Sequence, residues 1–181
     1  MLKHRVIPCL LIQDGGLVKT EKFQKPKYVG DPINAVRIFN EKEVDELIIL
    51  DINASRNQVE PNYQLIEQIA SECFMPVCYG GGVKTVAQAQ KILSLGIEKI
   101  ALQSVAIEDL KVVRSFADFA GSSSVVISVD VKNDWRGRKC LYSSQRRKIT
   151  NQPWQKFILE AVEAGAGEIL MMDVDREGTM S

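Results

Sequence analysis

The sequence predicts an α/β fold made of repeated strand–helix units, and three observations support that prediction. Short apolar runs rich in β-branched residues alternate with helical patterns, as in parallel sheets built from right-handed βα units. The predicted strands are continuous apolar runs, which is typical of sheets covered on both faces. Asp31-Pro32 supplies a capping residue followed by proline, which marks the start of the first helix.

Six strands and five helices are predicted in alternation. Residues 46–52 resemble residues 168–174 at an offset of 122, which indicates a half-barrel repeat starting near residue 122. Two such halves form an eight-stranded (βα)8 TIM barrel of roughly 250 residues. We therefore expect residues 1–181 to form a single, C-terminally incomplete barrel domain, a partial barrel of about six βα units without strands seven and eight. The strands are predicted at 5–12, 47–51, 76–79, 99–103, 125–130 and 168–172, and the helices at about 32–43, 62–73, 85–95, 107–119 and 152–164.

Composition and charge narrow the classes of function. The 23 Lys and Arg residues balance 23 Asp and Glu residues, which argues against nucleic acid or an anionic membrane as the main partner. No run of 18 apolar residues and no signal-peptide pattern is present, and the four cysteines form no CxxC pair, so we expect a cytoplasmic protein. The single histidine, His4, argues against a histidine-based nucleophile system or metal site, and we expect no metal and no cofactor.

Functional residues of a barrel gather at the carboxyl ends of its strands. Asp51 and Asp130 each end an apolar strand, where partial burial would raise the pKa of a carboxyl group into a range suited to acid/base chemistry. The alternative is a structural role, either as a helix cap or as an ion-pair partner, with Lys132 or Lys19 as candidates for Asp130. The residues alone leave both interpretations open.

Three consecutive glycines, Gly80-Gly81-Gly82, lie between the third strand and the next helix. Such glycines let backbone N–H groups approach a phosphate at a helix N-terminus, and the alternative is a tight turn that needs positive φ. Gln103 and Ser104, at the next strand end, would add further donors. The basic segment 133–150 is either an anion-binding lid or a solvated loop, and we expect Trp135 and Trp154 to be packing residues.

Four charged residues lie at the opposite rim, where the strands begin. They would form a closed ring of two cations and two anions, or else a set of unrelated surface ion pairs worth little energy. From physical chemistry alone the second interpretation is favoured. The four residues are Arg5, Glu46, Lys99 and Glu168.

Taken together, these features resemble the cyclase subunit of imidazole glycerol phosphate synthase, a (βα)8 barrel of histidine biosynthesis. The matching stretches run from residue 5 to 179 and read RVIPCL, GLVK, GDP, DELIILDI, YGGGVKT, LGIEKI, VVISVDVK, AGAGEIL and DREGT. In that family, a glutaminase partner supplies ammonia through the N-terminal face of the barrel. The ammonia reacts at the other end with a ribonucleotide that carries a phosphate at each end.

The resemblance implies partners and roles for individual residues. It implies a glutaminase subunit at the N-terminal face and a phosphorylated small-molecule substrate, and it makes the four charged residues the ammonia gate, which replaces the surface ion-pair interpretation. Asp130 matches one of two catalytic aspartates. The substrate- and phosphate-binding positions fall on Lys19, Asp51, Gly81, Gly82, Gln103, Ser104, Glu177 and Gly178.

The sequence departs from the family at the first catalytic aspartate, where it has Leu11. A leucine cannot exchange a proton, and losing one acid/base group ordinarily costs roughly 10²–10⁴-fold in rate. Gln103 stands where the family usually has asparagine, and Met172 and Asp173 stand where small hydroxyl residues are usual. We therefore expect a diverged relative that still uses ammonia.

Two substrate classes fit such a relative: a phosphorylated ribonucleotide, or a nucleotide-linked sugar, as in relatives that occur beside enzymes of surface-polysaccharide synthesis. The alternative function is a catalytically impaired barrel that serves as scaffold or allosteric partner of a glutaminase, and a third is phosphate binding alone. Because strands one and six would have open edges, we expect the chain to be a fragment or to self-associate through them.

Overall fold

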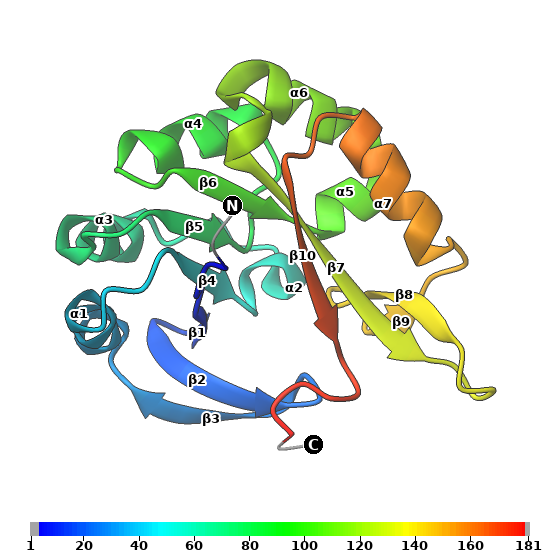
Figure 1. Cartoon of the computed structure of the whole chain (residues 1–181), viewed down its shortest axis with the longest axis horizontal. Coiled ribbons are helices and arrows are strands. Elements are labelled where there is room, and N and C mark those ends of the chain that lie inside the picture. Colours follow the sequence, from blue (N-terminus) through cyan, green and yellow to red (C-terminus); the bar gives the residue numbers. More distant parts are fainter. Residues whose placement is uncertain (1–3, 180–181) are drawn as a thin grey trace. The chain divides into compact units, whose positions relative to one another are not determined.

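The computed structural model describes residues 4–179 and follows the predicted alternation (Figure 1). The α/β fold class is confirmed, and the predicted strand at 47–51 has the predicted bounds. The six main strands are β1 (Cys9–Gln13), β4 (Leu47–Asp51), β5 (Val77–Gly80), β6 (Lys99–Leu102), β7 (Val125–Asn133) and β10 (Glu168–Asp173). The five main helices are α1 (Pro32–Glu41), α3 (Tyr63–Glu72), α4 (Val86–Ser94), α6 (Leu110–Ala120) and α7 (Trp154–Glu163).

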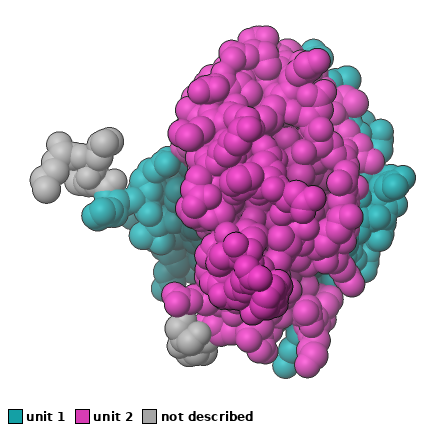
Figure 2. All heavy atoms as spheres, turned by 90° about the vertical axis from the view of Figure 1, so that its right-hand side faces the viewer, with its two compact units in different colours: residues 1–19, 27–83, 87–100 teal, residues 20–26, 84–86, 101–181 magenta. Residues whose placement is uncertain are grey.

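The chain divides into two compact units, coloured separately in Figure 2. Unit 1 holds the residues up to 19 together with 27–83 and 87–100, and unit 2 holds 20–26, 84–86 and the residues from 101 onward. In unit 1, β4 pairs in parallel with both β1 and β5. In unit 2, β10 pairs in parallel with β7 over its whole length. Among the described strands, β7 is the one partner of β10.

The helices form where capping and apolar spacing predict them. Asp31 caps α1, because its side chain accepts a hydrogen bond from the Asn34 N–H at 3.1 Å and Pro32 occupies the first turn. On α6, Val113, Phe116 and Ala117 are buried at the spacing of one helical face, and this helix packs on β7 within unit 2. No helix among residues 4–179 is long and apolar enough to span a membrane.

A hairpin at the first strand is not among the predicted elements. After β1, the chain turns at Asp14-Gly15, both with positive φ, and returns as β2 (Gly16–Glu21), followed by β3 (Gln24–Gly30). β2 pairs antiparallel with β1 from Leu11 to Gln13, so the expected open edge of the first strand is wrong over that stretch. An Asp-Gly pair is the usual sequence signal for such a two-residue turn.

The basic segment 133–150 is largely strand and turn rather than an unstructured loop, and its role as an anion-binding lid stays a prediction. β7 continues to Asn133 and pairs antiparallel with β8 (Lys139–Ser143), which pairs with β9 (Lys148–Ile149). At the tip of the β7–β8 hairpin, Trp135 is 84% exposed, so the expectation that it packs is wrong. Its ring lies 4.2 Å from the Arg136 guanidinium carbon. Three short helical segments were also not predicted: α2 (Ala54–Asn57), α5 (Ser104–Glu108) and a 3-10 turn at Ser122–Ser124.

Candidate functional site

Unit 1 brings three of the four predicted gate residues together. Glu46, just before β4, is buried, and its Oε2 accepts hydrogen bonds from Lys99 Nζ at 2.7 Å and from Arg5 Nη1 at 3.2 Å. The side chain of Lys99 is 14% exposed and that of Arg5 is 50% exposed. A buried carboxylate shared by two cations is not a surface ion pair, since each partner compensates the cost of burying the charge. The fourth residue, Glu168, begins β10 in unit 2.

Asp51 lies at the carboxyl end of β4 and has the capping geometry that was one of its two interpretations. Its Oδ1 accepts from the N–H groups of Asn53 and Ala54, both at 3.0 Å, at the start of α2. Burial raises the pKa of Asp51 above its ordinary value, and the two backbone hydrogen bonds oppose that rise. The second predicted binding residue of unit 1, Lys19, is an exposed side chain on β2.

The glycines after β5 are required by the backbone itself. Gly81 has φ +122°, and a Cβ there would lie 2.5 Å from the carbonyl oxygen of Asp51. Gly82 has φ +73°, its Cβ would lie 2.9 Å from the Val59 carbonyl oxygen, and its N–H donates to Ser55 Oγ at 3.2 Å. The tight-turn interpretation therefore accounts for both glycines, and their phosphate-binding role stays a prediction.

In unit 2, Asp130 is the most deeply buried candidate, with 4% of its surface exposed near the carboxyl end of β7. Its Oδ2 accepts hydrogen bonds from Gln103 Nε2 at 2.6 Å and from the Ser144 hydroxyl. Burial raises the pKa of Asp130 to about 6, and these two hydrogen bonds limit the rise. The Lys132 ammonium instead lies 5.2 Å from the centre of the Tyr142 ring.

Gln103 and Ser104 lie at the end of β6 and the start of α5. The Gln103 side chain also accepts, through Oε1, a hydrogen bond from the Ser144 backbone N–H at 3.2 Å. Sequence reasoning missed Ser144, because its position depends on the antiparallel β7–β8 hairpin. No pattern in the sequence signals that pairing.

Glu177 and Gly178 lie in the loop after β10. Both carboxylate oxygens of Glu177 accept hydrogen bonds within unit 2, from the Thr20 hydroxyl at 2.7 Å and the Phe23 N–H at 2.9 Å. Its carbonyl oxygen accepts from the Lys22 N–H at 2.9 Å. Gly178 has φ +68°, and a Cβ there would lie 2.1 Å from the Thr20 carbonyl oxygen. The Glu177 side chain therefore holds residues 20–23, and a phosphate role for this loop stays a prediction.

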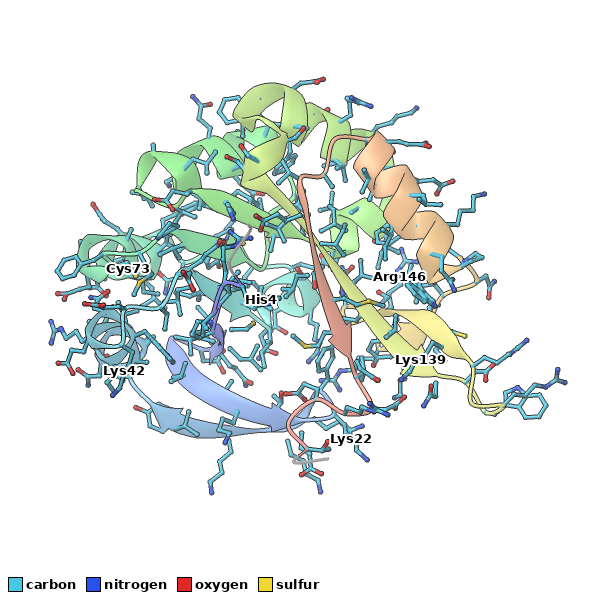
Figure 3. All side chains as sticks on the ribbon, viewed as in Figure 1. His4, Lys22, Lys42, Cys73, Lys139 and Arg146 are labelled. Carbon is cyan, nitrogen blue, oxygen red and sulfur yellow. The ribbon has the colours of Figure 1, made fainter. Side chains whose placement is uncertain are left out.

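A second anchor at the end of β10 was also missed. Lys139 Nζ, whose residue is labelled in Figure 3, donates to both Asp173 oxygens at 2.7 Å. This ammonium holds the pKa of Asp173 below its ordinary value. Asp175 Oδ2 accepts from the Asn133 N–H at 2.7 Å, so two carboxylates tie the β7–β8 hairpin to the end of β10. Within residues 4–179, no three His, Cys, Asp or Glu side chains gather in a way that could hold a metal ion.

Comparison with known proteins decides the family. The profile of the family described as "Histidine biosynthesis protein" matches residues 5–181. The chain belongs to the histidine biosynthesis protein family. The match confirms the predicted resemblance and the partial (βα)-barrel fold class, and the described residues contain six main strands and five main helices.

Individual relatives support the same assignment for this family member. It is 55% identical to the "Putative imidazole glycerol phosphate synthase subunit hisF2" of Pseudomonas aeruginosa, over 98% of this chain and 71% of the relative. It is 51% identical to the "Putative imidazole glycerol phosphate synthase subunit HisF" of Leptospira interrogans, over 99% of this chain and 71% of the relative. It is 36% identical to the "Imidazole glycerol phosphate synthase subunit HisF" of Streptococcus sanguinis, over 100% of this chain and 72% of the relative. This member of the histidine biosynthesis family is thus HisF-like.

Proposed function

We propose that this HisF-like protein is the ammonia-using, cyclase-type subunit of a glutamine amidotransferase complex similar to imidazole glycerol phosphate synthase. The observation that carries the proposal is Asp130, a carboxyl group that is 4% exposed near the carboxyl end of β7 and whose pKa is raised to about 6. A group with such a pKa populates both protonation states near neutral pH, as a general acid/base must. The relatives named as synthase subunits support the same proposal.

Ammonia in this proposal passes the charged cluster of Arg5, Glu46 and Lys99. A glutaminase subunit would bind at the N-terminal face of the barrel, where β4 and β6 begin and the cluster lies, with Glu168 as the fourth gate residue. The support is the buried position of Glu46 and its contacts with both cations. Because two cations pair with its buried carboxylate, the Glu46 side chain keeps a defined position when ammonia passes.

The substrate is proposed to be a phosphorylated small molecule. One phosphate would be bound at the positions of Gly81, Gly82 and Ser104, and the other at the loop that holds Glu177 and Gly178. Lys19 and Asp51 are proposed as further substrate-binding residues. Gln103 would contact the phosphate at Ser104 through its second amide N–H, since the first N–H donates to Asp130.

Leu11 bears on the substrate class. This half-buried residue of β1 pairs with Leu50 of β4 and replaces a proton-exchanging group with an alkyl chain. We propose that the substrate needs one acid/base group rather than two, which favours a nucleotide-linked sugar over the phosphorylated ribonucleotide of histidine biosynthesis. Identities of 50–55% with relatives named hisF2, HisF and hisF3, against 36% with the streptococcal HisF proteins, support divergence from the latter.

The second candidate function is a catalytically impaired barrel that acts as scaffold or allosteric partner of a glutaminase, and Leu11 is the observation that favours it. The two candidates differ in a direct test. An active subunit consumes acceptor substrate when ammonium salt replaces the glutaminase. A scaffold raises the glutamine hydrolysis rate of its partner and consumes no acceptor.

The test measures ammonia-dependent turnover of the histidine-pathway ribonucleotide by this chain and by a chimera carrying the remaining βα units of the Pseudomonas aeruginosa relative. We expect no imidazole product from the chimera and detectable product from its Leu11→Asp variant. Product formation with Leu11 in place would refute the reassigned substrate. No product from either protein, together with stimulated glutaminase activity, would favour the scaffold.

Three further features of this protein are proposals as well. We propose a cytoplasmic location, supported by four cysteines that are thiols in the structure. We propose self-association through the edge of β10, which has β7 as its one partner among the described strands. A sedimentation experiment that shows a monodisperse monomer would contradict the proposed self-association. That both units form one barrel domain with a repeat near residue 122 stays a prediction.

A further inference from the structure

Gln103 has both ends of its side-chain amide engaged inside the protein. The NH₂ group donates to Asp130 Oδ2 at 2.6 Å, and the carbonyl oxygen accepts from the Ser144 N–H at 3.2 Å. The Ser144 hydroxyl donates to the same Asp130 oxygen, which closes a ring of three hydrogen bonds. All three residues belong to unit 2 and none is exposed.

We propose that Gln103 is a positioning residue, whose amide fixes the orientation of the Asp130 carboxylate and at the same time fixes the turn that begins at Ser144. The proposal deepens the proposed function and rests on it, because the acid/base role of Asp130 is its premise. It differs from the phosphate-binding role that resemblance assigns to Gln103. The contact with Asp130 uses one of the two N–H donors of the amide, so holding Asp130 is a role of its own beside any contact with a phosphate.

The arrangement selects one oxygen of the carboxylate for chemistry. Both donors reach Oδ2, and Oδ1 accepts no hydrogen bond from the described residues. An oxygen that accepts two strong hydrogen bonds is a poor proton acceptor, so Oδ1 is left to exchange a proton with the substrate. Without Gln103, the Ser144 hydroxyl alone would restrain rotation of the carboxylate about χ2, a torsion with a broad energy minimum.

The charged groups around Asp130 do not replace this contact. On β7, Lys132 points to the same face but lies over the Tyr142 ring, and on β8, Lys139 is paired with Asp173 of β10. The residue of β10 directly opposite Asp130 is Met172. Burial is the largest cause of the raised pKa of Asp130, and the two hydrogen bonds from Ser144 and Gln103 are the causes that oppose it. The helices that pack on β7 present apolar residues from their buried faces: Val113, Phe116 and Ala117 of α6, and Phe157 and Ala161 of α7.

The length of the side chain matters to both contacts. Glutamine is longer than asparagine by one methylene, about 1.5 Å. In asparagine the same amide group lies nearer the main chain by this length, so it is displaced from both Asp130 and Ser144. The family's usual asparagine therefore provides a specific variant, Gln103→Asn, that tests the two contacts together without introducing charge.

The experiment titrates the Asp130 carboxyl carbon by ¹³C NMR in the whole chain, with Asp130→Asn to identify the resonance. In Gln103→Met, which keeps the length and removes both hydrogen bonds, we expect the pKa of Asp130 to rise by about one unit, because a hydrogen bond to the ionised form is lost. Gln155→Met, the same change on the exposed face of α7, should leave that pKa unchanged. Hydrogen exchange of the Ser144 amide should speed up at least tenfold in Gln103→Met and stay constant in the control.

Ser144→Ala gives a second route if the glutamine variant folds poorly, with Ser143→Ala as its neighbouring control. An unchanged pKa of Asp130 in both Gln103→Met and Ser144→Ala would overturn the proposal. Because the titration needs no substrate, its outcome is separate from that of the proposed function. Where turnover is present, the acidic limb of the pH profile of kcat/KM should shift with the pKa of Asp130. A pH profile of kcat/KM that is unchanged in the variants would also overturn the proposal.

Discussion

Replacing Lys99 with methionine tests whether the buried carboxylate of Glu46 depends on its cations. The Glu46 side chain is 3% exposed, so removing the ammonium 2.7 Å from Oε2 leaves a desolvated charge with Arg5 as its remaining cation. Removing one partner of a buried pair costs roughly 3–5 kcal/mol. Arg5 is half exposed and still pairs with Glu46 in this variant, which offsets up to about 1 kcal/mol of that loss of stability. We therefore expect Lys99→Met to lower the free energy of unfolding by about 2–4 kcal/mol.

The assay is urea unfolding at neutral pH, followed by a signal from unit 1, with Arg37→Met as the matched control. Arg37 makes a two-bond ion pair with Glu72 in the same unit, but that pair is largely exposed. The control should lose much less stability than Lys99→Met. The double variant Glu46→Met/Lys99→Met should be more stable than Lys99→Met, because it removes the uncompensated charge. Equal losses in Lys99→Met and Arg37→Met would refute the reasoning.

Three further predictions concern other contacts. Burial raises the pKa of Asp130 from 3.8 to about 6, so between these pH values the folded state holds a proton that the unfolded state releases. The free energy of unfolding should therefore fall by on the order of 2–3 kcal/mol as pH rises from 3.8 to 6. Urea unfolding of Asp130→Asn and of the parent at pH 4 and 7.5 measures this fall. Gly81→Ala should cost at least about 2 kcal/mol, whereas Gly15→Ala, with positive φ but open space, should cost about 1 kcal/mol in thermal unfolding. Glu177→Gln should speed amide exchange at Phe23 and cost about 1–2 kcal/mol, and an unchanged exchange rate would contradict the hydrogen bond seen there.

The main strands and helices follow from local signals in the sequence. The run 47–51 is apolar throughout and ends in Asp51, and Asp31-Pro32 marks the start of α1, so both elements lie where the pattern predicts them. The β1–β2 hairpin carries the Asp14-Gly15 signal that could have identified it. β3 is almost wholly exposed along its length, so no alternation of apolar and polar residues indicates it.

The contacts of the candidate site were less accessible to sequence reasoning. Asp130 was found because it ends an apolar strand, but its donors come from positions 27 residues before and 14 residues after it. Such contacts depend on strand register and on the pairing of β7 with β8, which no short pattern encodes. Glu177 illustrates the same limit, since its acceptors are used by a segment 154 residues away in the sequence.

That last contact has a mechanical consequence. Through Glu177, the turn at residues 20–23 and the loop after β10 are joined by three hydrogen bonds, and Gly178 lies so close to Thr20 that no side chain fits between them. The two segments therefore move as one piece, although nearly the whole chain separates them. A molecule that binds to either segment therefore restricts the motion of both. Binding at the loop after β10 is coupled in this way to residues 20–23 through these hydrogen bonds rather than through the core.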